Sequence, residues 1–400
     1  MPAIFATHAP YLPEIATILA ASVIVWMIPA LRTQRGRLAM ALVTTCYLYR
    51  FEILNTIVWN AAGFLTLTAL DRYLIKRNGP RKLAWSYAQG FVLGLALVFI
   101  GIRVAVPTGL HLHIFGNDFI WLASPNMFLV LRLASLAWDH GAGRAALPPP
   151  STYVFWMFLP VTSRGPLLRY VEFERQGFKS GAPRGLPPSD PSINLTLGSG
   201  RWWRLCGLGV LQLAGAIAVS IGGHYFGTTP ARPILVKGLT TLLGPVAFYF
   251  ELAGTYHLME AFALCWGLRL PASFDNPFLR KNIAEFWKHW NMTITSFFRD
   301  YLFFNRWGLS KPNLYLNTMV LFIALGLWHA FNLYWGVWGA LQGLGFCAYL
   351  AWRNLRGAAP QDESTGGAGR FIGAAFTYLF LCATLYLPIK IALSLQAHLR

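Results

Sequence analysis

The stretch LFIALGLWHAFNLYWGVWGALQG, residues 321–343, decides the fold class of this 400-residue chain. Its residues are almost all apolar or small, and His329 is the only side chain in it that ionises near neutral pH. Such runs are typical of membrane-spanning helices, which need about 20 predominantly apolar residues. An ionisable residue at membrane depth indicates a functional site. The structural alternative is a histidine at the end of a span, hydrogen-bonded to a carbonyl group.

The composition of the whole chain also indicates a membrane protein. Hydrophobic residues make up 56% of the chain and charged residues only 12%, whereas soluble domains carry about 25% charged residues. The formal net charge is +18, but the basic residues lie between apolar blocks rather than on one soluble face. This arrangement argues against nucleic acid as a partner and favours contact with anionic membrane lipid. The five cysteines form no CxxC pair and predict neither a disulfide framework nor a zinc site.

Apolar blocks recur along the chain and predict an all-α integral membrane protein, a polytopic helical bundle of roughly eight to eleven spans. Residues 38–49 and 153–161 are the shortest blocks, and we expect them to be re-entrant or broken helices buried in protein. The other expected spans are residues 15–31, 53–70, 83–102, 119–137, 205–222, 239–252, 316–329, 334–351 and 371–393.

The basic residues predict how the chain is oriented. Residues 15–31 have no preceding basic segment and no clear cleavage site, so we expect a retained span rather than a removed signal. The basic segment RTQRGR, residues 32–37, follows directly and predicts a cytoplasmic end there and an extracytoplasmic N-terminus. The two longer polar intervals, residues 164–204 and 269–311, are expected to be cytoplasmic for the same reason.

The segment GLRLPASFDNPFLRKNIAEFWKHWNMTITSFFRDYLFFNRWG, residues 267–308, is rich in aromatic residues yet contains many polar ones. Exposure of so polar a segment to lipid is unfavourable. At helical spacing one face would carry Trp287, Asn291, Ile294, Thr295 and Phe298. The structural alternative is an amphipathic helix at the membrane surface with its aromatic face in lipid.

Five segments in order resemble the membrane-bound O-acyltransferases, in particular the bacterial branch that acylates cell-surface polymers, which includes alginate O-acetylases and teichoic acid D-alanyl transferases. Most of the resemblance lies in the C-terminal half, and each segment alone is weak. The segments are FLP and GPLLRY (158–160, 165–170), TYHLMEA (255–261), GLRLP with FDNPF (267–271, 274–278), EFWKHW with FRDYL (285–290, 298–302), and LWHA with WG and a later glycine (327–330, 335–336, 339).

Some positions depart from the pattern of that branch. Asn291 stands where the polymer-acylating enzymes usually have histidine, and asparagine is the usual residue in the eukaryotic branch that acylates lipids and proteins. Arg164 replaces an expected alanine, Leu258 replaces an expected aspartate, and the Gly-Gly turn after FRDYL is missing. These changes leave a different acceptor or partner open.

The resemblance implies an acyl transfer reaction in a central tunnel surrounded by spans and re-entrant segments. His329 would be the general base and Asn291 the donor to the oxyanion. Further tunnel or substrate-binding residues would be Trp287, Trp290, Thr295, Phe298, Arg299, Asp300, Trp328 and His257. No tightly bound cofactor and no metal are implied. The acyl group would come from acyl-CoA or an acyl carrier protein, and the acceptor would be a hydroxyl of an extracytoplasmic glycan.

The resemblance further implies a multi-pass protein of the bacterial inner (plasma) membrane. We expect a single domain over residues 1–400, with the catalytic core at about 153–345 and a flexible loop at 357–370. A periplasmic or extracellular partner protein of a polysaccharide-modification system is a further expectation. Two other functions stay open, namely acylation of a lipid, peptide or small metabolite, and a transporter or secretion scaffold without enzymatic activity.

Other polar residues of the chain are given structural roles by their spacing. Glu285 and Lys288 stand at i, i+3 and are expected to pair. Arg299 and Asp300 are adjacent, so on a helix they would point about 100° apart and bond to other elements rather than to each other. His111 and His113 alternate on one face of an expected strand, but a metal site there would need a third ligand.

Overall fold

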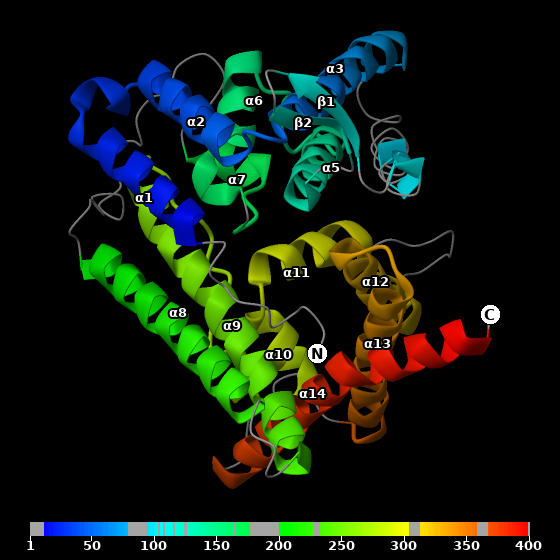
Figure 1. The fold of residues 1–400 in the computed structure, drawn as a ribbon. Helices are drawn as coiled ribbons and strands as arrows, with labels where there is room; N and C mark the ends of the chain where they lie inside the picture. Colours follow the sequence, from blue (N-terminus) through cyan, green and yellow to red (C-terminus); the bar gives the residue numbers. More distant parts are fainter. Residues whose placement is uncertain are drawn as a thin grey trace. The chain divides into compact units, whose positions relative to one another are not determined.

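The computed structural model describes residues 12–78, 94–95, 97–98, 100–102, 105–106, 109–114, 117–123, 126–163, 165–176, 200–227, 233–303, 313–357 and 367–398 (Figure 1). Its described part is helical apart from one two-stranded hairpin. The chain forms two compact units. The N-terminal unit contains residues 9–208 and 256–271, and the C-terminal unit contains residues 209–255 and 272–400. The expectation of a single domain stays a prediction.

The N-terminal unit is built from short and medium helices around the hairpin. Its elements are α1 (Leu12–Met27), α2 (Gln34–Leu48), α3 (Ile53–Asn78), β1 (Leu110–Ile114), β2 (Asn117–Leu122), α5 (Met127–Gly141), α6 (Pro150–Met157) and α7 (Tyr170–Arg175). Its core is rich in aromatic side chains, with Trp156 packed edge-on against Tyr170 at a ring distance of 5.4 Å. Both rings are almost fully buried, and the Trp156 indole donates a hydrogen bond to the Leu168 carbonyl.

The C-terminal unit holds the longer helices. The helices α8 (Gly200–Gly227) and α9 (Pro233–Cys265) each have one part in the N-terminal unit and the other part in the C-terminal unit. The helices wholly within the C-terminal unit are α10 (Ile283–His289), α11 (Met292–Phe298), α12 (Leu314–His329), α13 (Leu333–Leu355) and α14 (Gly367–His398). The helix that contains the expected span 239–252 is longer than that span. It is α9, which starts at Pro233, continues through Pro245 and ends at Cys265.

The expected spans agree with the observed helices in most of the described chain. Three helices are long and apolar enough to cross a membrane, over Ile53–Tyr73, Gly200–Gly223 and Ala368–Ile389. Leu12–Met27 and Leu314–His329 are shorter apolar helices. The total number of crossings stays a prediction, because the expected span 83–102 lies largely outside the described residues. Parts of the two polar intervals also lie outside the described residues, namely residues 164, 177–199 and 304–311. The same holds for residues 358–366 of the expected loop, whereas its last residues, from Gly367, begin α14.

The expected helix at 119–137 is wrong in its first third. Residues 117–122 form β2, which pairs antiparallel with β1 and extends the fold class beyond all-α. Alternating polar and apolar residues in LHLHI suit a strand with one face exposed. The helix begins only at Met127, where the Asn126 side chain accepts a hydrogen bond of 2.8 Å from the Phe128 backbone N–H. This N-cap fixes the start of α5.

The helices α12 and α13 form a hairpin in which the two backbones touch (Figure 1). Gly326 and Gly339 make this contact possible, because a Cβ added at either position would overlap a backbone carbonyl of the facing helix, that of Trp335 or Phe322 respectively. Small residues allow such close approach between membrane helices. The hairpin turn is short, and Asn332 caps α13 by accepting a hydrogen bond of 3.0 Å from the Trp335 N–H.

Candidate active site

The helical face that the sequence predicts from Trp287 to Phe298 is interrupted at Asn291. Asn291 has a φ of 40°, in the left-handed region, and separates α10 from α11. Asparagine tolerates this conformation better than most residues. The break is held by the preceding segment, because Met292 N–H donates to Ser273 O at 2.8 Å and Asp275 N–H donates to His289 O at 3.1 Å. The predicted continuous face is therefore wrong, since the chain turns where Asn291 lies.

His329 is the last residue of α12, and Ala330 ends the helix in an extended conformation. The imidazole is stacked on the indole of Trp335, with 4.5 Å between ring centroids and 22° between ring planes. Trp338 meets it edge-on at 5.7 Å. The ring is half-buried, and neither of its nitrogens has a hydrogen-bond partner among the described residues. The alternative in which a carbonyl group holds this histidine finds no support in that part of the chain.

Asn291 and His329 both line one pocket of the C-terminal unit. The pocket encloses about 730 Å³ of space not filled by atoms, part of it open to solvent, and its wall is mostly apolar and aromatic. Its other lining residues come from α9, α10, α11, α12, α13, α14 and the segment before α10: Pro245, Phe248, Leu252, Phe278, Phe286, Trp287, Trp290, Ile294, Thr295, Leu325, Trp328, Trp335, Trp338, Gln342, Leu381 and Leu385.

Several polar groups of the pocket residues are left without partners. The indole N–H groups of Trp287 and Trp338 are buried and form no hydrogen bond with the described chain. Gln342 donates to the Thr384 hydroxyl at 2.7 Å, while its side-chain oxygen has no partner in the part of the chain that the structure describes. The Asn291 side-chain oxygen accepts from the Thr293 hydroxyl at 3.5 Å, and its NH₂ group has no partner among the described residues. Buried polar groups rarely stay unpaired, so these groups suit a polar ligand.

The chemistry available in this pocket is proton transfer combined with hydrogen-bond donation. An imidazole can take up and release a proton near neutral pH. The unpaired Asn291 amide and the two unpaired indoles are uncharged donors, the type of group that stabilises an oxyanion in an apolar environment. The lining includes no serine or cysteine. The arrangement therefore suits direct attack by a hydroxyl better than a covalent intermediate on the protein.

Four of the expected tunnel residues line this pocket, and four do not. Trp287, Trp290, Thr295 and Trp328 are in its wall. Phe298 is buried behind it, with its ring 6.3 Å from that of Trp328. Arg299, Asp300 and His257 are not among the lining residues, and His257 belongs to the N-terminal unit.

The expectation that Arg299 and Asp300 do not bond to each other is wrong. The Arg299 guanidinium donates to the Asp300 carboxylate at 2.8 Å, and the two residues begin a π-helical turn, Arg299–Phe303. The wider turn and the long arginine side chain bring together two groups that an ideal α-helix would separate. The predicted pair of Glu285 and Lys288 is confirmed, with 2.6 Å between carboxylate and ammonium.

The remaining histidines lie outside the pocket. The His289 imidazole lies 2.7 Å from the Glu285 carbonyl oxygen. On the hairpin, His111 contacts the Asp118 carboxylate at 3.0 Å and His113 at 3.7 Å. Within the described ranges, no three His, Cys, Asp or Glu side chains are grouped as a metal site would require.

Sequence reasoning did not assign Trp338 and Gln342 to the site. Both lie on α13 on the same helix face as Trp335, at intervals of three and four residues. Gln342 is the only strongly polar side chain within the expected span 334–351. A polar residue inside an otherwise apolar span is the signal that identifies such a position.

The chain is similar in sequence to several bacterial enzymes that are named as acyl-transferring enzymes. The chain is 24% identical to the teichoic acid D-alanyltransferase of Streptococcus thermophilus over 342 residues, which are 79% of this chain and 74% of that protein. It is 32% identical to the probable alginate O-acetylase of Pseudomonas fluorescens over 108 residues, 26% of this chain and 22% of that protein. It is 28% identical to the peptidoglycan O-acetyltransferase of Helicobacter pylori over 118 residues, 29% of this chain and 22% of that protein. No protein-family model matches the chain.

Proposed function

The chain is homologous to the bacterial membrane-bound O-acyltransferases, and from this premise we propose that it transfers an acetyl group from a cytoplasmic thioester to a hydroxyl of an extracytoplasmic glycan. The similar proteins named above act on teichoic acid, alginate and peptidoglycan, all of which are polymers of the cell surface. The chain spans only about a fifth of the length of the two O-acetyl transferring relatives, 22% in each case. Both the acetyl group and the glycan acceptor are therefore part of the proposal.

One observation carries the proposal: an imidazole and an asparagine NH₂ group, neither with a hydrogen-bond partner in the described part of the chain, line the same pocket. His329 acts as the general base and Asn291 as the oxyanion donor. Uncharged donors suit this environment, because a lysine or arginine would be costly to bury at membrane depth. The unpaired indoles of Trp287 and Trp338 are further donors for the acyl carbonyl group.

The reaction follows from these roles. His329 takes the proton from the acceptor hydroxyl while that oxygen attacks the thioester carbonyl carbon, and Asn291 donates a hydrogen bond to the oxyanion that forms. The carbon–sulfur bond then breaks, the carbonyl re-forms, and the sulfur leaves as a thiolate that takes the proton from the imidazolium. The products are an ester on the acceptor and a free thiol on the donor, so the protein ends in the state in which it began.

The donor and the cellular setting belong to the same proposal. Acyl-CoA and acyl carrier protein both carry anionic groups, which the basic intervals of the chain would attract. The protein would lie in the bacterial inner membrane with its N-terminus outside, and a periplasmic or extracellular partner would assist transfer to the polymer. No tightly bound cofactor is required, because the thioester already supplies the activated acyl group.

The test is an acyl transfer assay with the purified full chain in detergent or vesicles. Wild type and His329→Ala are incubated with labelled acetyl-CoA and isolated surface polysaccharide, and ester formation is followed. His113→Ala is the matched control, since that histidine is exposed on the hairpin of the other unit. We expect loss of about 10²-fold or more in rate for His329→Ala, the typical effect of removing a general base, and an unchanged rate for His113→Ala.

The outcomes separate the proposal from its competitors. Near-normal turnover by folded His329→Ala would exclude His329 as the base. Transfer of D-alanine from a loaded carrier protein, with no use of acetyl-CoA, would keep the mechanism and reject the acetyl donor. Esters on lipid or peptide, but not on polysaccharide, would reject the glycan acceptor. Flux of a solute through reconstituted protein without consumption of thioester would instead indicate a transporter.

A further inference from the structure

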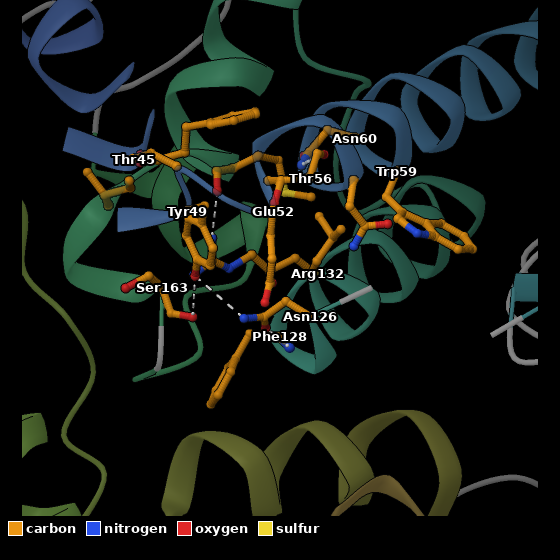
Figure 2. Close-up of a pocket in the computed structure, with 15 residues that line it drawn as sticks. Thr45, Tyr49, Glu52, Thr56, Trp59, Asn60, Asn126, Phe128, Arg132 and Ser163 are labelled. Carbon is orange, nitrogen blue, oxygen red and sulfur yellow. Dashed lines mark hydrogen bonds between the residues drawn. The ribbon is translucent and has the colours of Figure 1, made fainter. Parts of the chain in front are cut away.

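A second pocket lies in the N-terminal unit, apart from the residues proposed for catalysis. It encloses about 550 Å³ of space not filled by atoms, including space open to solvent. It is formed by residues of α2, α3, α5 and the segment after α6, and Figure 2 shows the side chains that line it. Polar groups are frequent in its wall, whereas the pocket with His329 is mostly aromatic.

The deepest charge in this pocket is the guanidinium of Arg132, whose residue is only 3% exposed. Its two terminal nitrogens donate to backbone carbonyls, one to Met157 at 3.1 Å and one to Thr162. Among the described residues, its Nε–H group has no hydrogen-bond partner and no carboxylate forms an ion pair with it. A buried hydrogen-bond donor is thus left unused in the wall of the pocket.

A buried acceptor is left unused in the same wall. Asn60 is 5% exposed, and its side-chain NH₂ donates to the Thr56 carbonyl at 2.8 Å. A carbonyl oxygen can only accept, so this contact fixes the orientation of the amide. The Asn60 side-chain oxygen is buried and has no hydrogen-bond partner within the described ranges. Leaving a buried polar atom unpaired costs about 1–3 kcal/mol, so an unpaired donor and an unpaired acceptor in one pocket together indicate a ligand able to bond to both.

The charges of the pocket limit the class of ligand. Glu52 lines the pocket, is exposed, and forms no ion pair with any described residue. The pocket wall therefore carries one carboxylate and one guanidinium, and a ligand of either net charge would meet a like charge there. Further polar contacts come from Tyr49, whose hydroxyl donates to Ser163 O at 3.4 Å and accepts from Asn126 at 3.5 Å (Figure 2).

We propose that this pocket binds an uncharged polyhydroxylated ligand, a segment of glycan. A sugar hydroxyl both donates and accepts, so neighbouring hydroxyls can accept from Arg132 and donate to Asn60 and Glu52. The aromatic rings of Trp59 and Phe128 in the same wall offer apolar surface for the carbon face of a sugar ring. The proposal deepens the proposed function by giving the polymer acceptor a place to bind, but the binding itself needs no acyl transfer.

Binding is tested on the full chain in detergent with a fluorescently labelled N-acetylglucosamine tetrasaccharide, followed by anisotropy. We expect saturable binding that unlabelled tetrasaccharide displaces, whereas equal concentrations of glycerol 3-phosphate or phosphatidylethanolamine do not. Asn60→Leu removes the unpaired acceptor at similar volume and should weaken binding about tenfold or more, equivalent to about 1.4 kcal/mol. Glu14→Gln, a carboxylate substitution in α1 outside the pocket, should leave binding unchanged.

Three results would overturn the proposal: no saturable binding of the tetrasaccharide, equal binding by wild type and folded Asn60→Leu, or preferential displacement by the anionic or zwitterionic probe. The first would mean that the pocket holds ordered water only. If Asn60→Leu does not fold, Glu52→Arg at an exposed position replaces it, and we expect its preference to move from the tetrasaccharide to glycerol 3-phosphate. His329→Ala should bind the tetrasaccharide as wild type does, so loss of transfer and loss of glycan binding are separate outcomes.

Discussion

Substitution of Gly339 by alanine tests whether the backbone contact of α12 and α13 positions His329. A Cβ at residue 339 would overlap the Phe322 carbonyl oxygen and lie 2.9 Å from the Ile323 Cα, so the two helices would have to separate. Gly336 lies one turn earlier on α13 and is the matched control. A Cβ there would meet only the Leu327 side chain, at an ordinary contact distance of 3.6 Å.

The expected magnitudes follow from these contacts. Overpacking typically costs about 1–3 kcal/mol, and replacing glycine by alanine within a helix contributes up to about 1 kcal/mol of stability. Gly339→Ala should therefore destabilise the fold by about 1–2 kcal/mol, while Gly336→Ala should stabilise it slightly. Separation of the helices also displaces His329 from Asn291, and a shift of about 1 Å at a reacting group can lower a rate about 10²-fold. We expect a rate loss of about tenfold to hundredfold for Gly339→Ala.

Both variants are compared with wild type by thermal unfolding in detergent at one scan rate and by the acyl transfer assay. The expected order of unfolding midpoints is Gly336→Ala at or above wild type, with Gly339→Ala a few degrees lower. Equal midpoints and equal rates for the two variants would refute the reasoning, because they would mean that the helices do not meet at Gly339. A lower midpoint of Gly339→Ala with an unchanged acyl transfer rate would support the close contact of α12 and α13, but it would show that this contact does not position His329.

Three further predictions concern single contacts. Asn291→Gly keeps the left-handed backbone but removes the amide, so its acyl transfer rate should fall about 10²–10³-fold with little change in midpoint, whereas Asn291→Ala should also lose about 1–2 kcal/mol of stability. Burial raises the pKa of the Glu285 carboxyl, but the hydrogen bond and charge of Lys288 outweigh it and hold that pKa below its ordinary value of 4.5. The stability that the pair contributes is then present above pH 4.5 and lost as the pH falls below it. At neutral pH, Glu285→Gln should lower the free energy of unfolding by about 0.5 kcal/mol at most. In acid, the unfolding midpoints of wild type and Glu285→Gln should coincide. Asp71→Leu removes the carboxylate that lies 2.8 Å from His140, and its midpoint should fall by an amount equivalent to about 1–3 kcal/mol; an unchanged midpoint would mean that this contact adds nothing.

The sequence predicted those elements that depend on composition and length. The apolar blocks at 53–70, 205–222 and 371–393 became α3, α8 and α14, because a long apolar run has few alternatives to a helix in a membrane protein. The strand around His111 and His113 was expected, but its partner β2 was predicted as part of a helix, since short strands are stabilised by pairing with each other rather than by any local preference.

The interruption at Asn291 also could not be predicted from local sequence. Residues on either side form helices, and the left-handed turn is held by two backbone hydrogen bonds, one accepted by Ser273 and one donated by Asp275, which lie eighteen and sixteen positions before Asn291. The resemblance of the motifs nevertheless predicted Asn291 and His329 as site residues, and both line one pocket. Their catalytic roles stay predictions. The tunnel assignment of Arg299 and Asp300 rested on their place in a motif, which gives no information on the direction of a side chain.

The stacking of His329 on Trp335 has a consequence for how an acceptor can approach. An indole covers one face of the imidazole at 4.5 Å, and a second ring, that of Trp338, lies against it edge-on. In the proposed reaction a hydroxyl would approach a ring nitrogen from outside the covered face, along the plane of the ring and in line with the nitrogen lone pair. Slender primary or equatorial hydroxyls satisfy this geometry, whereas a crowded tertiary alcohol does not, so the tryptophans would select acceptors by shape before any proton moves.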